Sequence, residues 1–187
     1  DTSAFRKWTP IGTATYKYNG HFDGQCYTIK GLYMSDTDVS FGGLFGYTAS
    51  NSVIEKVGID YSYFKGNQYI GGICGYNSGK IDNCYCFYTM LQGNSYVGGI
   101  TGYNDGTVQN CYNAGLVNAN SYVGGVAGAN NSKLSNCYYL VNVATDGSSA
   151  VQNGIGQSAQ GTATADVSGS TEGKTIEEFA NGEVAYL

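Results

Sequence analysis

The chain has few of the residues that carry common enzyme and nucleic-acid chemistry. Its 187 residues include one histidine and one proline, and only 12% of them are charged. Lys and Arg number 9 against 14 Asp and Glu, which gives a net charge of −5. A nucleic-acid-binding domain needs a basic face. The composition therefore predicts no nucleic-acid partner.

Several functional motifs are also absent. No apolar run approaches the ~18–20 residues that cross a bilayer, so we expect no membrane insertion. CxxC and HExxH are missing and His21 has no partner ligand, so we expect no metal. Residues 169–175 lack one position of the phosphate-binding-loop spacing, and we expect no cofactor. No signal peptide precedes Asp1, and we interpret the chain as a mature piece of a longer protein.

What the chain does contain is an internal repeat. Four Gly-Gly pairs follow one another at steps of 29, 27 and 26 residues, beginning at Gly42, Gly71, Gly98 and Gly124. An Asn-Cys-Tyr block follows three of these pairs, beginning at Asn83, Asn110 and Asn136. A fixed period of this length indicates stacked copies of one supersecondary unit.

The residues of the repeat favour strands over helices. Each unit is rich in Gly, Asn, Tyr and Val, which are poor helix formers, whereas Tyr and Val are frequent in strands. Apolar alternation breaks at the Gly-Gly pair and before the Cys of the second block, where we place corners. A unit of about 26 residues with three short strands and three corners suits one coil of a parallel β-helix. We therefore predict an all-β solenoid of about five coils.

Stacking of the coils in register predicts columns of equivalent residues. Coils ~4.8 Å apart place such residues directly above one another. We expect four inward columns: Phe41/Ile70/Val97/Val123, Leu44/Ile73/Ile100/Val126, Ile54/Ile81/Val108/Leu134 and Val57/Cys84/Cys111/Cys137. A column shared by Val and Cys indicates a small apolar core position, which predicts buried thiols, with disulfides as the alternative.

Other columns are expected at the corners and on the surface. The first glycines of the four pairs are predicted to stack at one corner, and Asn83, Asn110 and Asn136 at another, because Asn tolerates left-handed geometry. Aromatic ladders are expected from Tyr69/Tyr96/Tyr122 and Tyr85/Tyr112/Tyr138. Asp23, Asp60, Asp82 and Asp105 are expected in different columns. Only Asp82 and Gln109 share one, so no acidic ladder is expected.

The ends of the chain depart from the repeat. We assign 1–142 to the coils, with 1–39 as an irregular first coil and repeats near 40–66, 67–93, 94–120 and 121–142. The remainder, 143–187, is a Ser/Gly-rich connection and a C-terminal cap. Thr175 and Glu178 form a T-x-x-E capping box, which predicts a helix of about two turns before a last strand, Glu183–Leu187. Such a cap would cover the open edge of the last coil.

These residues resemble the GLUG-repeat proteins. The resemblance is carried by the four GG-[LIV]-x-G blocks, the three Asn-Cys-Tyr blocks, and segments near the two ends: Trp8–Gly12, Phe22–Gly24, Ile29–Leu32 and Glu178–Leu187. It implies a right-handed β-helix in a secreted or surface-anchored bacterial protein. Adhesin-like proteins and non-catalytic regions of immunoglobulin A1 metallopeptidases are of this kind. The resemblance brings no catalytic residues.

We therefore expect a structural or adhesive module without enzymatic activity, located outside the bacterial cell or on its surface. One alternative is a β-helix that binds or cleaves carbohydrate, because paired carboxylates need only meet in space. Another is a spacer domain of a larger secreted peptidase. A host glycan, a matrix protein or neighbouring domains of the same chain are the expected partners, and we expect a monomer.

Tyrosine, used 18 times, is the best indication of a ligand contact. Tyr47, Tyr76 and Tyr103 follow the Gly-Gly blocks in three successive coils, and Ala129 ends the row in the fourth. Alternation along each strand predicts that these three side chains point outward. An exposed row of tyrosines can stack sugar rings or anchor a protein. The alternative is that the rings pack against one another and serve only the fold.

Overall fold

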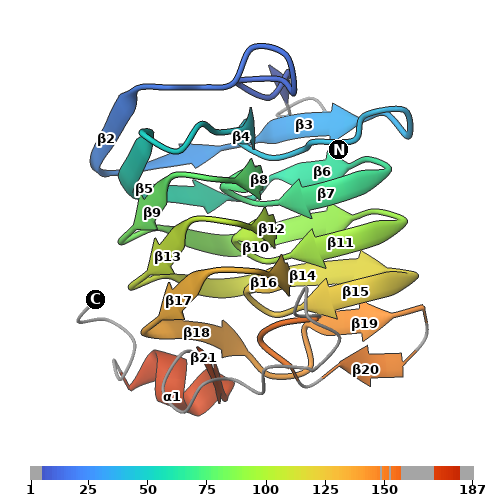
Figure 1. The fold of residues 1–187 in the computed structure, drawn as a ribbon. Helices are drawn as coiled ribbons and strands as arrows, with labels where there is room; N and C mark the ends of the chain where they lie inside the picture. Colours follow the sequence, from blue (N-terminus) through green and yellow to red (C-terminus); the bar gives the residue numbers. More distant parts are fainter. Residues whose placement is uncertain (1–5, 148, 152, 157–170, 182–187) are drawn as a thin grey trace.

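The computed structural model describes residues 6–147, 149–151, 153–156 and 171–181. The chain winds into a β-solenoid of about five turns whose strands form parallel sheets, with successive coils stacked along the molecule (Figure 1). The predicted all-β class and parallel β-helix are therefore confirmed. The last strand predicted, 183–187, lies outside the described residues.

Two of the three sheets are short parallel stacks, one with strands from four successive coils and one with strands from three. The four-stranded sheet consists of β4 (Phe45–Tyr47), β8 (Cys74–Asn77), β12 (Thr101–Asn104) and β16 (Ala127–Asn130). The three-stranded sheet consists of β7 (Gln68–Gly71), β11 (Ser95–Gly98) and β15 (Ser121–Gly124). These sheets hold the residues on either side of the Gly-Gly pairs.

The third sheet has 14 strands and wraps around the rest of the coil. It begins with β1 (Arg6–Lys7), β2 (His21–Lys30) and β3 (Leu32–Ser35). Its central strands are β5 (Val53–Asp60), β6 (Tyr63–Lys65), β9 (Lys80–Asp82), β10 (Tyr85–Gln92), β13 (Thr107–Gln109) and β14 (Tyr112–Ala119). It ends with β17 (Lys133–Ser135), β18 (Cys137–Leu140), β19 (Ala144–Asp146), β20 (Ser149–Val151) and β21 (Thr171–Lys174). The ladder between β19 and β20 is antiparallel.

Three successive coils each have four strands rather than the three predicted: β7–β10, β11–β14 and β15–β18. The third repeat contains β11, β12, β13 and the long β14. β14 continues through Asn113-Ala114-Gly115, residue types that end strands elsewhere in the chain. The buried Asn113 side chain accepts a hydrogen bond from the Gly115 N–H (2.9 Å) and donates one to the Gly115 carbonyl (3.1 Å). These local bonds hold the bend within the strand.

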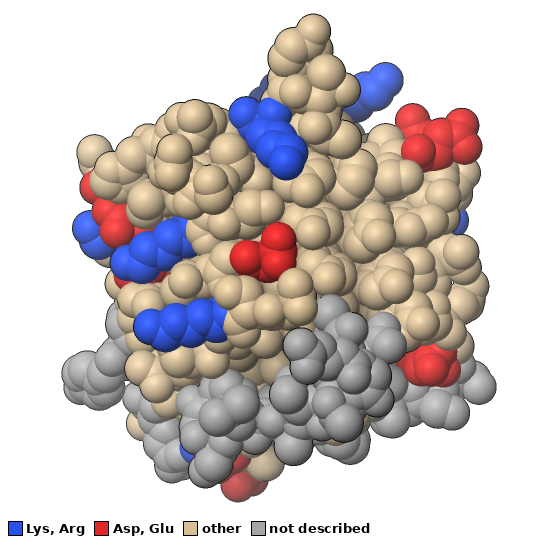
Figure 2. Space-filling view, viewed as in Figure 1, with Lys and Arg blue, Asp and Glu red and all other residues tan. Residues whose placement is uncertain are grey.

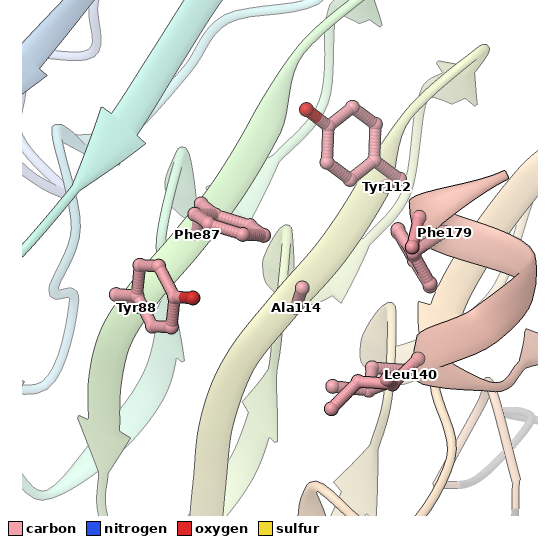
Figure 3. Close-up of a pocket in the computed structure, with 8 residues that line it drawn as sticks. Phe87, Tyr88, Tyr112, Ala114, Leu140 and Phe179 are labelled. Carbon is pink, nitrogen blue, oxygen red and sulfur yellow. The ribbon is translucent and has the colours of Figure 1, made fainter. Parts of the chain in front are cut away.

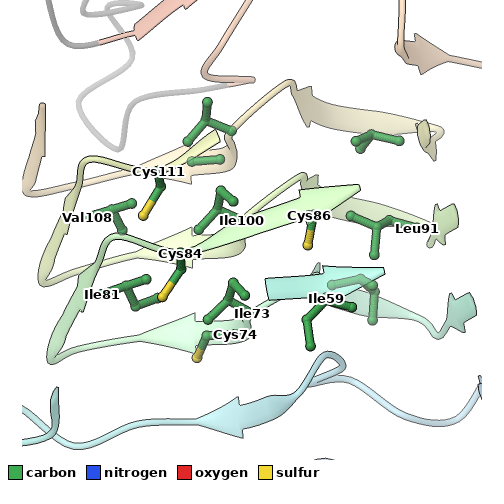
Figure 4. Close-up of a cluster of buried hydrophobic side chains, with 14 of the residues drawn as sticks. Ile59, Ile73, Cys74, Ile81, Cys84, Cys86, Leu91, Ile100, Val108 and Cys111 are labelled. Atoms are coloured by element: carbon green, nitrogen blue, oxygen red, sulfur yellow. The ribbon is translucent and has the colours of Figure 1, made fainter. Parts of the chain in front are cut away.

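The core is the set of inward columns (Figure 4). Ile81 pairs with Ile54 on one side and with Val108 on the other, and Val108 pairs with Leu134, as predicted. The columns Leu44/Ile73/Ile100/Val126 and Val57/Cys84/Cys111/Cys137 are likewise buried throughout. All six cysteines are free thiols, and all except Cys26 are buried. The prediction of buried thiols at 84, 111 and 137 is confirmed.

The first repeat is offset by one residue from the prediction. Gly42, not Phe41, forms the bridge to Ile70, whereas Phe41 stacks on the ring of Tyr69 at 5.3 Å. Gly71 does align with the first glycines of the next two pairs, but Gly42 is not part of that column. The reason is steric: a Cβ on Gly42 would lie 2.4 Å from Met34 Cε, because Met34 fills the inward space at this end.

Asparagine columns line two corners. Asn83, Asn110 and Asn136 adopt φ values of 52°, 54° and 50°, which confirms the predicted left-handed corner. A second column, Asn77/Asn104/Asn130, was not predicted as a ladder. Its side chains form amide-to-amide hydrogen bonds of 2.8 and 2.7 Å from one coil to the next, and Asn77 and Asn104 are fully buried.

The C-terminal cap consists of β21, which pairs in parallel with β18, and α1 (Ile176–Ala180). Thr175 caps the helix: its hydroxyl accepts from the Glu178 N–H while the Glu178 carboxylate accepts from the Thr175 N–H. The predicted capping box is confirmed, but the helix is shorter than the two turns predicted. No residue of α1 is buried, so the helix rests on the solenoid without entering its core.

Candidate binding surfaces

The three predicted site residues form a tyrosine ladder on one lateral face. Tyr47, Tyr76 and Tyr103 lie in register on β4, β8 and β12, and Ala129 takes the next position. Their rings stack at centroid distances of 4.4 and 4.8 Å. All three residues are only partly exposed. The row exists as predicted, but its ring faces between neighbours are covered by the stack itself.

A second aromatic column borders this ladder. Phe41, Tyr69, Tyr96 and Tyr122 stack at 5.3, 5.0 and 4.4 Å, which confirms the predicted Tyr69/Tyr96/Tyr122 ladder. The two columns meet edge to face, as where Tyr69 contacts Tyr76 at 5.8 Å. Burial, above all, raises the pKa of the Tyr76 phenol. The stacking therefore leaves ring edges and hydroxyl groups, rather than ring faces, for contact with a ligand.

Charge is sparse around this region. Figure 2 shows a mostly uncharged face, with basic side chains toward the edge formed by β9, β13 and β17. Lys17 Nζ lies 4.4 Å from the Tyr47 ring centroid, in cation–π geometry. A ligand on this face would meet aromatic and hydroxyl groups, with Asp105 as the acidic neighbour of Tyr76 and Tyr103.

A different lateral surface exposes several large apolar side chains. We define the apolar patch as Tyr61, Tyr88, Met90, Leu116 and Ile176, whose exposed fractions are 57%, 60%, 44%, 53% and 70%. Tyr61 stacks on Tyr88 at 5.2 Å, and Met90 is the strand neighbour of Leu116. Exposed apolar groups gathered on one side of a soluble protein mark interaction surfaces. Sequence analysis did not single out this surface.

A groove lies within the patch, between β10/β14 and α1. Its volume is about 420 Å³, and it is lined by Phe87, Tyr88, Tyr112, Ala114, Leu140, Ile176, Phe179 and Ala180 (Figure 3). Phe179 of the helix packs against Tyr112 at 5.8 Å. The Tyr88 hydroxyl points toward Ala114, whereas the Tyr112 hydroxyl points away from it. Burial raises the pKa of Tyr112 to about 12, so this phenol is neutral at physiological pH.

An exposed lysine pairs with a buried carboxylate beside Tyr61. Lys30 Nζ lies 2.8 Å from Asp60 Oδ2 and 5.6 Å from the Tyr61 ring centroid. Asp60 is 7% exposed, and its other oxygen, Oδ1, is buried without a hydrogen-bond partner. Nearby, the hydroxyls of Tyr85 and Thr28 share a hydrogen bond. The predicted stacking of Tyr85 on Tyr112 is confirmed at 5.0 Å.

The structure also contains an acidic column, contrary to the expectation that there is none. Asp23, Glu55 and Asp82 occupy equivalent positions on β2, β5 and β9. Glu55 and Asp82 directly follow Ile54 and Ile81, which pair with each other as predicted. Asp23 joins them because it follows Phe22, the partner of Ile54 in the irregular first coil. Glu55 accepts from His21 Nε2 at 3.0 Å, and Asp82 from Lys80 at 2.7 Å.

Asp82 has the environment of a structural carboxylate. It is 6% exposed and accepts hydrogen bonds from Gln109 and Asn110, both at 2.9 Å, as well as from Lys80. Burial alone would raise the pKa of Asp82, but these bonds outweigh it and hold the pKa below its ordinary value. Across the described part of the chain, no group of three potential ligands is arranged to hold a metal ion.

The GLUG motif model matches residues 66–85, which include the second Gly-Gly block and its Asn-Cys-Tyr block. This confirms the resemblance to GLUG-repeat proteins that the sequence suggested. A protein of Evansella cellulosilytica, whose name describes it as a Gly-rich membrane protein, is 34% identical over 79 residues. That alignment covers 41% of this chain and 9% of the relative. No solved structure matches the chain. Among the described residues, no helix has the length and apolarity needed to cross a bilayer.

Proposed function

We propose that this chain, which carries a GLUG motif, is a non-enzymatic adhesive module of a bacterial cell-surface protein. The motif and the relative described as a membrane protein support the placement at the surface. The relative is far longer than the matched segment, which supports a role as one module within a larger chain.

The apolar patch is the observation that carries an adhesive role over a purely spacing one. A spacer needs only a polar lateral surface. Here, in contrast, Tyr61, Tyr88 and Leu116 each expose more than half of their surface. Exposing large apolar side chains is unfavourable unless a partner covers them. Two of these residues, Tyr61 and Tyr88, are held in left-handed conformations (φ 42° and 41°), which fixes their rings at the corner.

The environment of the carboxylates supports a non-enzymatic role. Glycoside cleavage needs one carboxyl group with a raised pKa as the general acid and a second one opposite it. In the acidic column, however, Glu55 and Asp82 each contact a basic side chain, and the pKa of Asp82 is lowered. These contacts favour a structural role for both residues.

Glycan binding along the tyrosine ladder is a second candidate, favoured by the row of phenol hydroxyls that the stack presents. Since neighbouring rings cover one another at 4.4 and 4.8 Å, a glycan would contact ring edges and hydroxyls instead of inserting between faces. Hydroxyl groups at this repeat suit an extended polymer that lies along the solenoid axis.

One adhesion experiment tests both candidates. Beads coated with the purified chain are applied to an array of matrix proteins and glycans. The patch variant Tyr61→Ser/Tyr88→Ser/Leu116→Ser is expected to lose protein adhesion, whereas the control Tyr16→Ser/Tyr27→Ser, which removes two exposed rings elsewhere, retains it. Loss of glycan binding in Tyr76→Ser/Tyr103→Ser would support the second candidate. Adhesion that is unchanged in the patch variant would reject the first.

A matching assay tests the absence of enzymatic activity. The purified chain is incubated with plant, host and microbial polysaccharides, and new reducing ends are measured. We expect none above the level of a heat-unfolded sample. Release that disappears in Glu55→Gln or Asp82→Asn would show that the acidic column is catalytic.

A further inference from the structure

We propose that the groove between β10/β14 and α1 binds an aromatic or branched apolar side chain of a partner polypeptide flanked by basic residues. This inference deepens the proposed adhesive function by naming the chemistry of the partner. The groove brings rings from both walls together, with Phe87 and Tyr88 on the sheet and Phe179 on the helix. Its volume of about 420 Å³ accommodates one large side chain and the adjoining backbone.

The polarity of the walls selects an apolar occupant over a sugar. All the lining residues are aromatic or aliphatic, and their side-chain polar groups are the hydroxyls of Tyr88 and Tyr112. The Tyr112 hydroxyl points away from Ala114, on the groove floor, which leaves Tyr88 as the near donor (Figure 3). A pyranose ring would bury several hydroxyl groups without partners, each at a cost in free energy. An indole, a phenyl ring or a leucine side chain has few or no such groups to satisfy.

Two apolar side chains that line the groove remain largely exposed to solvent, which leaves apolar surface for an occupant to cover. Ile176 is 70% exposed and Tyr88 60% exposed, although both line the groove. No residue of α1 is buried. An apolar side chain seated between α1 and the sheet would cover both residues, with burial of aromatic area as the main source of affinity.

The negative charge of the C-terminal cap favours a partner with basic residues on either side of its apolar side chain. Lys174 Nζ lies 3.0 Å from Glu172 and 3.6 Å from Glu178, and Glu177 adds a further carboxylate in the first turn of α1. This leaves an excess of negative charge beside Ile176 and Phe179, in a chain whose net charge is already −5. A partner with Lys or Arg near its apolar anchor complements this field.

Defined peptides test the inference by NMR titration of the ¹⁵N-labelled chain. The probe is acetyl-Lys-Gly-Trp-Gly-Lys-amide, and the comparison peptides replace Trp by Ser or both Lys by Glu. We expect the probe to shift the amide signals of Ala114 and Phe179. Each comparison peptide is expected to bind at least tenfold more weakly. Equal binding of the three peptides would overturn the proposal.

Two groove variants and one matched control complete the test. Ala114→Phe fills the groove and Tyr88→Ser removes a wall, so each should weaken probe binding at least tenfold. Tyr27→Ser removes a more exposed ring outside the groove and should leave binding unchanged. Unchanged binding in Ala114→Phe and Tyr88→Ser, or stronger shifts of the same signals with chitohexaose, would reject a polypeptide site.

The outcomes also separate this inference from the proposed function. Patch-dependent adhesion to a matrix protein, with no binding of the probe in the groove, would leave the adhesive function standing and reject the groove as its anchor site. Shifts of the groove signals on simple concentration of the chain, without any peptide, would instead identify a second copy as the occupant and also reject the proposal.

Discussion

Single glycines decide where the bulky side chains of the next coil lie. A Cβ on Gly58 would lie 2.0 Å from Tyr85 Cζ, because the Tyr85 ring lies flat across that glycine. The ring thereby reaches the Thr28 hydroxyl and stacks on Tyr112. Inside the coil, Gly72 plays the same part for Cys86, whose Sγ occupies the space of the missing Cβ. The glycines of the repeat thus leave space for side chains of the next coil, in addition to forming corners.

The contact between Gly58 and the Tyr85 ring predicts that substitutions at these two positions have non-additive effects on stability. Gly58→Ala should displace the Tyr85 ring and lower the free energy of unfolding by ~2 kcal/mol, the worth of one aromatic pair and one hydrogen bond. Tyr85→Ala should cost a similar amount. Adding Gly58→Ala to Tyr85→Ala should then cost little, since the three nearest atoms to the new methyl group all belong to Tyr85. Urea unfolding of the three variants measures this, and additive losses would contradict it.

The Asp82 carboxylate predicts a loss of stability in acid. Its pKa is lowered in the folded state, so the stability it contributes is present above the unfolded pKa near 3.8 and is lost as pH falls through the lower, folded value. The wild type should be more stable than Asp82→Asn at pH 7, and the gap should shrink below about pH 4. Glu177→Gln, at an exposed site, is the control. A gap that stays constant down to pH 2.5 would show that Asp82 has no such role.

At the scale of elements, the buried asparagine ladder ties the coils together on one corner. Asn104 Nδ2 donates to Asn130 Oδ1 and to the carbonyl of Lys133, while its Oδ1 accepts from Asn77 at 2.8 Å. Each of these asparagine side chains therefore forms hydrogen bonds both with backbone groups of a turn and with the amide of the asparagine in the next coil. Such a network stabilises only while every member is present, because a missing member leaves buried polar groups unpaired.

Removing one member of the ladder should therefore be costly. Asn104→Ala is expected to lower the free energy of unfolding by ~2–4 kcal/mol, since it leaves several buried groups unpaired. Asn136→Ala, at the exposed end of the other asparagine column, should cost ~1 kcal/mol. Thermal or urea unfolding compares the two variants. An equal effect at both positions would mean that burial of the ladder contributes nothing.

The strand register could be predicted where the repeat is regular. It could not be predicted where residues of the non-repeating first coil contact the repeat. The columns through Ile81, Val108 and Cys111 follow from the period alone, because identical coils repeat the same geometry. The offset at Gly42 depends on Met34, which comes from the non-repeating first coil and fills the space that Phe41 was expected to occupy. The acidic column likewise begins in the non-repeating first coil, where Asp23 on β2 pairs with Glu55.

At the scale of the whole molecule, one register produces both the core and the binding surfaces. The pairing that buries Cys84 and Cys111 also stacks Tyr85 on Tyr112 and Tyr76 on Tyr103. The tyrosine ladder could therefore be predicted from spacing. The groove could not, because it forms where α1 docks against strands more than 50 residues earlier in the chain, and no local pattern encodes that contact.

Counting reactive thiols tests this register most directly. Five of the six cysteines face the core and Cys26 is exposed, and burial raises the pKa of the Cys74 thiol to about 12. Titration with a thiol reagent at pH 8 without reductant should therefore show one fast-reacting thiol in the native chain and six after unfolding. Two or more fast thiols in the native chain, or fewer than six after unfolding, would contradict the stacked arrangement of free, buried cysteines.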